Sequence, residues 1–118
     1  MTSYTESNLE PMISYAQNGE DVLIRRLFPD KKDGFYIDVG AYHPTIDSVT
    51  KYFYEKGWRG INIEPIESIY HLLEQERPRD INLNVAVSDT AGVATFHEIS
   101  EFLGWSSLNN VVVLKAQE

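Results

Sequence analysis

The sequence contains no cysteine among its 118 residues. Disulfides, thiolate nucleophiles and cysteine-based zinc or iron–sulfur sites are therefore excluded. Basic residues are also scarce, because ten Lys and Arg stand against 18 Asp and Glu and give a formal net charge of −8. A protein that binds nucleic acid through its phosphates needs a basic face, so this balance argues against DNA or RNA as a partner.

Long apolar runs are absent as well. No segment approaches the roughly 18 to 20 consecutive apolar residues of a membrane-spanning helix. Residues 1–11 are polar and acidic and lack the basic start and apolar core of a signal peptide. We therefore expect a cytoplasmic protein without a membrane span, in which residues 1–13 form a flexible arm and residues 14–118 form one domain.

Helical and extended patterns alternate along that domain. Asn18 is a candidate N-cap for a helix that ends before Pro29, and residues 35–39 (FYIDV) form a nearly continuous apolar strand that we expect to be buried on both faces. The remaining expected elements are helices over 47–56 and 67–77, strands over 60–64, 81–87 and 93–99, a loop over 101–110, and a strand or helical turn over 110–118. This alternation predicts an α/β fold with a mostly parallel sheet.

Two carboxylates and a glycine stand at the ends of the predicted strands. Open α/β sheets bind ligands outside the carboxyl ends of their strands. The first strand ends in Asp38, Val39 and Gly40, and the second ends in Glu64. Gly40 lets a ligand approach the backbone closely, and a carboxylate in the position of Glu64 can accept hydrogen bonds from both hydroxyls of a ribose. The pattern predicts a ligand that contains a nucleoside.

Only one glycine follows the first strand, and this bears on the identity of the ligand. An NAD site needs G-x-G-x-x-G to bring a pyrophosphate to a helix N-terminus, whereas residues 40–45 read GAYHPT. S-adenosylmethionine (SAM) has no phosphate to hold, and Asp38 would repel one. The residues therefore favour SAM and disfavour a dinucleotide oxidoreductase.

Four sequence blocks, in this order, resemble the FkbM-type SAM-dependent methyltransferase family. They are residues 14–21 (SYAQNGED), 34–44 (GFYIDVGAYHP), 56–65 (KGWRGINIEP) and 82–89 (NLNVAVSD). The resemblance extends over roughly residues 14–108. It implies a three-layer, Rossmann-like class I methyltransferase fold, SAM as cofactor, and O-methylation of a hydroxyl on a sugar or natural product, so that the partner is a small-molecule or glycan acceptor.

The resemblance also implies a set of cofactor contacts. Asp38 and Gly40 would lie beside the methionine part of SAM, Glu64 would bind the ribose hydroxyls, and residues 86–88 would lie near the adenine. The full set is Asp38, Gly40, Ala41, Tyr42, His43, Glu64, Pro65, Ala86, Val87 and Ser88. The family's fourth strand, with its Asp-x-Glu-Gly-type segment, is not found in this sequence. We therefore expect a domain truncated after its first half, with uncertain activity as an isolated chain and no catalytic base assigned.

Simpler interpretations stay open beside these. Asp38 could only cap the turn that follows it, and Glu64 could be a solvated carboxylate at the end of a strand. Gln17 and Glu20 could either face the pocket or only begin a helix. His43 is a candidate pocket wall or base, although a single loop histidine is more often exposed or bonded to backbone. No metal-ligand spacing links the three histidines, so we expect no metal site.

The alternative to an enzyme is a non-catalytic α/β module. Such a module would be a remnant that binds nucleoside weakly or serves in oligomerisation. The first predicted strand would have an unpaired edge, and an edge of this kind favours a homodimer or strand exchange.

Overall fold

Two three-stranded sheets organise the chain. The structure, a computed structural model, describes residues 10–100 and 105–115. The elements in chain order are α1 (Glu20–Leu27), β1 (Phe35–Val39), α2 (Lys51–Glu55), β2 (Arg59–Ile63), α3 (Glu67–Glu76), β3 (Ile81–Leu83), β4 (Val85–Ser88), β5 (Gly92–Ser100) and β6 (Trp105–Lys115). The predicted α/β alternation is confirmed through β3. Residues 1–9 of the predicted arm, and residues 116–118, lie outside the described residues.

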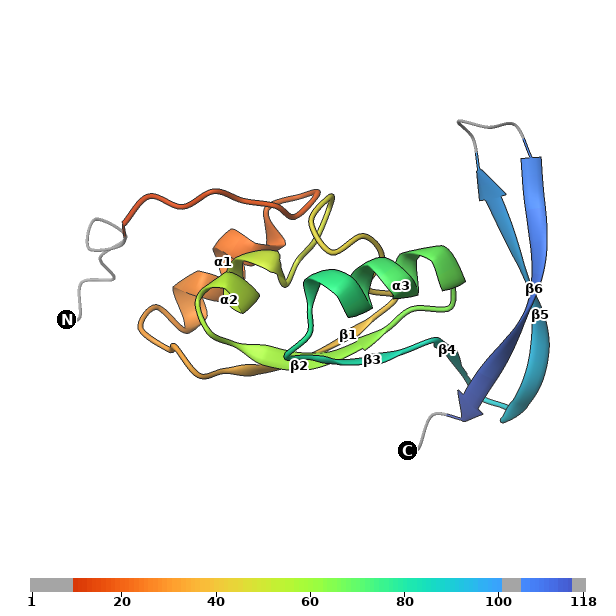
Figure 1. The fold of residues 1–118 in the computed structure, drawn as a ribbon. Coiled ribbons are helices and arrows are strands. Elements are labelled where there is room, and N and C mark those ends of the chain that lie inside the picture. Colours follow the sequence, from red (N-terminus) through yellow and green to blue (C-terminus); the bar gives the residue numbers. More distant parts are fainter. Residues whose placement is uncertain (1–9, 101–104, 116–118) are drawn as a thin grey trace.

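The first sheet has the order β1-β2-β3, and both of its strand pairs are parallel. Its register places Asp38 beside Asn62 and Val39 beside Ile63. The three helices lie together on one face of this sheet (Figure 1). Since each connection between consecutive parallel strands passes through a helix on that face, the carboxyl ends of β1 and β2 meet at one edge.

The second sheet has the order β4-β6-β5 and stands beside the first (Figure 1). β5 and β6 form an antiparallel hairpin, and β4 pairs with β6 in parallel. The expectation of one strand over 81–87 is wrong, because the chain leaves the first sheet after Leu83 and Asn84 separates β3 from β4. The expected loop over 101–110 is wrong for residues 105–110, which pair with β5, and the strand alternative is correct for 110–115.

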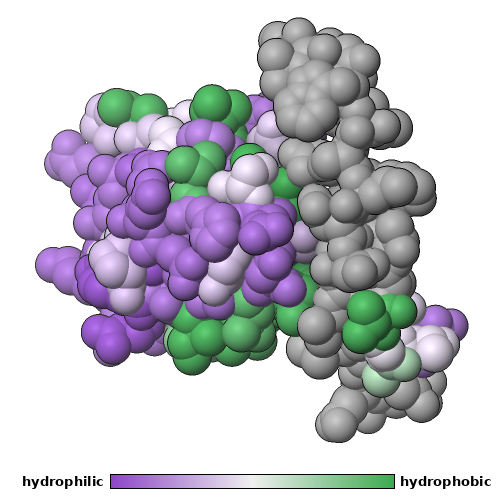
Figure 2. All heavy atoms as spheres, turned by 45° about the vertical axis from the view of Figure 1, so that its right-hand side comes forward, coloured by the Kyte–Doolittle hydropathy of each residue, from purple (hydrophilic) through white to green (hydrophobic). Residues whose placement is uncertain are grey.

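The two faces of the first sheet differ in chemistry. The face beneath the helices carries Tyr36, Asp38 and Asn62, whereas the opposite face carries Phe35, Ile37 and Val39, each more than half exposed. Figure 2 shows hydrophobic residues gathered along the lower side of the body, where this open face lies. The expectation that strand 35–39 is buried on both faces is therefore wrong. Among the described residues, every helix packs on the other side.

The apolar core lies between the sheet and the helices. It is centred on Phe53 and Trp58, whose rings are 4.8 Å apart, and on Leu73 of α3. The Trp58 indole N–H donates to the backbone oxygen of Lys31 at 2.8 Å, so its one polar group is satisfied. Gly34 packs directly against this ring, and a Cβ there would lie 2.3 Å from it. Trp58 therefore anchors the core.

The start of α1 departs from the sequence expectation. The N-cap of α1 is Gly19, at φ 74°, and the predicted Asn18 cap is wrong. Asp21 is completely buried and instead fastens the preceding loop, accepting hydrogen bonds from the Ser14 hydroxyl (2.6 Å) and the Tyr15 N–H (2.8 Å). Within the described residues, no helix combines the length and apolarity needed to cross a bilayer.

The second helix is shorter than the predicted span 47–56. Asp47 lies at φ 56°, which a helix cannot accommodate, and the Ser48 hydroxyl accepts the N–H of Lys51 at 3.1 Å. Residues 47–50 are therefore a turn, and the helix begins at Lys51. Gly57 follows it at φ 105°, a conformation typical of a glycine just beyond a helix C-terminus.

Candidate cofactor site

Backbone hydrogen bonds bring the ends of the three parallel strands together. The N–H groups of Gly40 and Ala41 both donate to the Ile63 oxygen, at 2.8 and 3.1 Å. The N–H of Glu64 donates to the Leu83 oxygen at 3.0 Å. The turn after β1 and the first residue after β2 therefore form one edge, where the sequence predicts a ligand.

The turn at Gly40 leaves room in front of the backbone. Gly40 lies at φ 71°, and a Cβ built on it would meet no atom within 4 Å. Tyr42, two residues on, is also left-handed at φ 59°, and its side chain is largely exposed. A non-glycine residue in this region is strained, and such strain persists where neighbouring contacts hold it. A turn that has free space in front of it, and whose backbone is held in place by neighbouring contacts, is suited to receive a ligand.

Glu64 is one of the contacts that hold this turn. It is only 3% exposed, and one carboxylate oxygen accepts the Tyr42 N–H while the other accepts the Ile66 N–H, both at 2.8 Å. A single side chain therefore fastens the turn after β1 to the start of α3. The alternative of a solvated strand-end carboxylate is therefore wrong, because Glu64 is buried and bonded to two amides. Contact with a ribose stays a prediction, since a carboxylate oxygen can in general accept more than one hydrogen bond.

Asp38 lies on the helix-covered face at the end of β1. Its Oδ2 accepts a hydrogen bond from the Thr50 hydroxyl at 3.5 Å. Burial raises the pKa of Asp38 above its ordinary value, while the Arg77 charge and the Thr50 hydrogen bond act in the opposite direction. A cationic ligand group at this edge would act in the same direction as Arg77 and would lower the pKa of Asp38.

His43 serves the loop that follows the turn. Its Nδ1 accepts the N–H groups of Thr45 and Ile46, each at 3.0 Å. Accepting two donors there requires the neutral ring to carry its proton on Nε2. Of the interpretations left open by the sequence, bonding to backbone is the one shown, and the geometry gives no support to a catalytic base.

The helix-start residues give a similar result. Gln17 is exposed, and Glu20 accepts the N–H of Asn18 at 2.7 Å. Their geometry matches a helix start.

The third group of predicted residues follows the break after β3. Ala86, Val87 and Ser88 belong to β4, in the second sheet, so their proximity to an adenine stays a prediction. The residue directly beyond β3 is Asn84, whose side-chain amide donates to the backbone oxygens of Glu64 (2.9 Å) and Pro65 (3.0 Å). Asn84 therefore secures the edge from the β3 side, a role that sequence reasoning missed.

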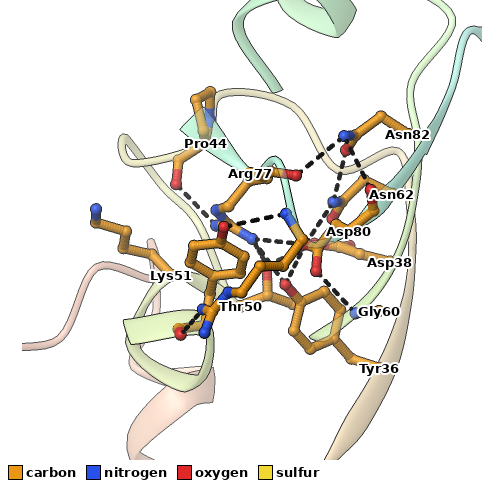
Figure 3. A network of polar contacts seen from close by, with 12 residues as sticks. Tyr36, Asp38, Pro44, Thr50, Lys51, Gly60, Asn62, Arg77, Asp80 and Asn82 are labelled. Atoms are coloured by element: carbon orange, nitrogen blue, oxygen red, sulfur yellow. Dashed lines mark hydrogen bonds and ion pairs between the residues drawn. The ribbon is translucent and has the colours of Figure 1, made fainter. Parts of the chain in front are cut away.

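Beneath the edge lies a polar cluster centred on Arg77 (Figure 3). Its side chains, hereafter the Arg77 cluster, are Tyr36, Ser48, Thr50, Asn62, Arg77 and Asp80. Burial and the hydrogen bond to Asp80 raise the pKa of the Tyr36 hydroxyl, which therefore stays protonated and donates to that carboxylate. None of these side chains was singled out from the sequence. The available signal was the placement of polar residues at every second position, as in FYIDV and INIE.

Two cavities formed by described residues lie elsewhere. One of about 350 Å³ lies beside residues 11–13 and α2, and one of about 540 Å³ lies among α1, the loop 28–32 and α2. No predicted cofactor residue lines either of them. The part of the chain that the structure describes also contains no group of three His, Asp or Glu side chains able to hold a metal ion.

Comparison with known proteins places this edge inside a recognised domain. A family model described as the Methyltransferase FkbM domain matches residues 38–117, which is 80 of the 118 residues. The match begins at Asp38 and includes the Gly40 turn, Glu64 and the Arg77 cluster apart from Tyr36. No curated protein and no solved structure matches the chain.

Proposed function

The chain belongs to the FkbM methyltransferase domain family, and we propose that it is a SAM-dependent methyltransferase with its cofactor at the edge formed by β1 and β2. The family match supports methyl transfer in general. The cofactor, the O-methylation of a sugar or natural-product hydroxyl, and a class I fold with three layers are our proposal. The parallel order β1-β2-β3, with a helix in each connection, supports that fold.

The observation that carries the proposal is the open turn at Gly40 beside two carboxylates, the buried Glu64 and the partly buried Asp38. The free space in front of Gly40 would be filled by a side chain, and the fixed backbone on either side of it needs no rearrangement to receive a ligand. This arrangement suits a sulfonium nucleoside such as SAM better than a dinucleotide, because nothing in it is adapted to a pyrophosphate.

The side chains at this edge would bind the cofactor and orient it. Asp38 would hold the ammonium of the methionine part, and ionisation of its carboxyl would become easier beside that positive charge. Glu64 would accept from the ribose hydroxyls while it continues to hold the Tyr42 and Ile66 amides. SAM supplies a methyl group already activated on a sulfonium, so the protein contributes orientation and removal of the acceptor proton.

Titration calorimetry with S-adenosylhomocysteine tests this proposal. We expect saturable binding at one site by the wild-type chain. Glu64→Ala should weaken it by roughly tenfold to 100-fold, the equivalent of one hydrogen bond to a charged group. Glu64→Gln, which keeps one acceptor oxygen, should have an intermediate effect. Glu67→Ala is the matched control, because Glu67 lies in the first turn of α3 and is exposed.

The second candidate is the non-catalytic module. It is favoured by the finding that Glu64 and His43 both have structural roles in holding backbone amides. A chain that is folded by circular dichroism and binds no S-adenosylhomocysteine would contradict the methyltransferase proposal and support the module. Binding of NADH in its place would instead indicate a dinucleotide enzyme.

A further inference from the structure

Arg77 is buried between the first sheet and the loop after β1, although arginine has the longest of the charged side chains. It follows α3 directly, and only 1% of it is exposed. A buried guanidinium is costly unless each of its donors is paired. The partners of Arg77 divide into two sets, one on the loop between β1 and α2 and one on the sheet (Figure 3).

The first set holds the loop at three points. Nη2 donates to the backbone oxygen of Pro44 (2.8 Å) and to the Ser48 hydroxyl (3.2 Å), and Nη1 donates to the Thr50 hydroxyl (3.1 Å). All three partners are buried. They span residues 44–50, the segment that joins the Gly40 turn to α2.

The second set fixes the guanidinium against the sheet. Nη1 also donates to the Tyr36 hydroxyl at 3.0 Å and lies 3.5 Å from Asp80 Oδ2. Asp80 is itself held by the Gly60 N–H and the Asn62 amide, each at 2.8 Å. The guanidinium of Arg77 therefore fixes the position of the loop relative to residues of β1 and β2.

Thr50 extends this connection to the cofactor edge. Its oxygen accepts from Arg77, and its hydroxyl donates to Asp38 at 3.5 Å. Arg77 therefore acts on the turn after β1 from both ends, through Asp38 before Gly40 and through Pro44 after it. Lysine could not replace it, because a single ammonium has three donors at one point and cannot reach both sets.

We propose that Arg77 is a positioning residue for the cofactor turn, holding residues 44–50 and Asp38 in the arrangement that receives the amino-acid part of the cofactor. This role rests on the proposed function. It predicts a selective effect, because Arg77 holds the loop side of the edge, whereas Glu64 would bind the nucleoside side.

Two ligands separate this role from simple loss of stability. S-adenosylhomocysteine contains the amino-acid part, and methylthioadenosine lacks it. In Arg77→Lys we expect the affinity for S-adenosylhomocysteine to fall roughly tenfold, while the affinity for methylthioadenosine changes by less than about threefold. Amides of residues 41–50 should also exchange with deuterium faster, while those of α1 keep their rates.

A second variant keeps the proposal testable if Arg77→Lys does not fold. Thr50→Val preserves the shape of the side chain and leaves the Arg77–Asp80 pair intact, and it should show the same ligand selectivity to a smaller degree. Arg79→Lys is the matched control. It lies two residues away, is exposed and stacks on Tyr54, so both affinities should stay at the wild-type values.

The outcomes distinguish the two proposals. Equal losses for the two ligands, or unchanged exchange of residues 41–50, would show that Arg77 only stabilises the fold and would overturn the inference. The proposed function would then stand, because the wild-type chain still binds both ligands. A wild-type chain that binds neither ligand would contradict the proposed function and the positioning role together.

Discussion

The two faces of the first sheet are opposite to what burial of apolar residues alone would produce. The face beneath the helices is lined by Tyr36, Asp38, Asn62 and their partners, whereas the open face carries Phe35, Ile37 and Val39. Burying polar groups is tolerable only when they are hydrogen-bonded, and on the covered face nearly all of them are. One exception among the described residues is Asn62 Oδ1, which is buried and has no partner.

The difference shows how this fold divides its tasks. The covered face uses directional bonds to fix loops at the carboxyl edge, where the candidate site lies. The open face offers non-directional apolar contact, and a contiguous apolar patch is typical of a surface that packs against something else. Each prediction below changes one face and compares it with the other or with the surface.

The largest effect is expected from opening the ion pair on the covered face. Asp80 and Arg77 have side chains that are 0% and 2% exposed. Asp80→Ala leaves the guanidinium buried without a counter-charge, and removing one partner of a buried pair costs about 3 to 5 kcal/mol. Urea unfolding followed by circular dichroism would measure this loss, with Asp33→Ala as control.

The control residue also forms an ion pair, but its side chain is exposed and not buried. Asp33 pairs with Lys31 at 3.7 Å, and its side chain is 92% exposed. Exposed pairs of this kind contribute at most about 1 kcal/mol. Similar unfolding free energies for the Asp80 and Asp33 variants would mean that the Arg77 cluster is hydrated in solution, and the contrast between the two faces would disappear.

The polar half of this contrast could have been predicted from the sequence. In FYIDV, INIE and INLN, polar residues occupy every second position, and period two is the pattern of a strand with unlike faces. The apolar residues of FYIDV, taken alone, predict a strand that is buried on both faces, and the structure shows that this prediction is wrong. The identity of the polar partners was not predictable, because Arg77 meets Pro44 and Tyr36 only after the chain has folded, 33 and 41 residues apart.

Element types were predictable where the pattern was strong, and element ends were not. Strand 35–39 matches the expectation because local residues decide it. The start of α2 depends on the left-handed Asp47, and the break at Asn84 depends on its bonds to Glu64 and Pro65. At the candidate site, Gly40 and Glu64 were found from strand-end logic, while the structural bonds of Glu64 were not.

A smaller effect, which depends on pH, is expected on the covered face at the end of β1. Burial raises the folded-state pKa of Asp38, so the folded state binds the proton more tightly than the unfolded state. The resulting stabilisation is present below the ordinary Asp pKa of about 4 and is lost as pH rises through the folded-state value. Wild-type stability should therefore fall relative to Asp38→Asn between about pH 4 and neutral pH.

Urea unfolding of both chains at several pH values would measure this difference. The Asn oxygen can still accept from Thr50, so the comparison isolates the charge. A wild-type chain that gains stability relative to Asp38→Asn as pH rises would show that the Arg77 charge outweighs burial. The Arg77 cluster would then be the dominant influence on the cofactor edge.

The smallest effect is expected on the open face. Ile37 is 63% exposed at the centre of β1, opposite Ile61. Ile37→Thr keeps a β-branched side chain in the strand, so the unfolding free energy should change by no more than about 0.5 kcal/mol. Leu73→Ala, at a fully buried position of α3, should cost about 2 to 5 kcal/mol in the same assay. A cost above about 1.5 kcal/mol for Ile37→Thr that grows with protein concentration would show that the face is covered by a second copy of the chain.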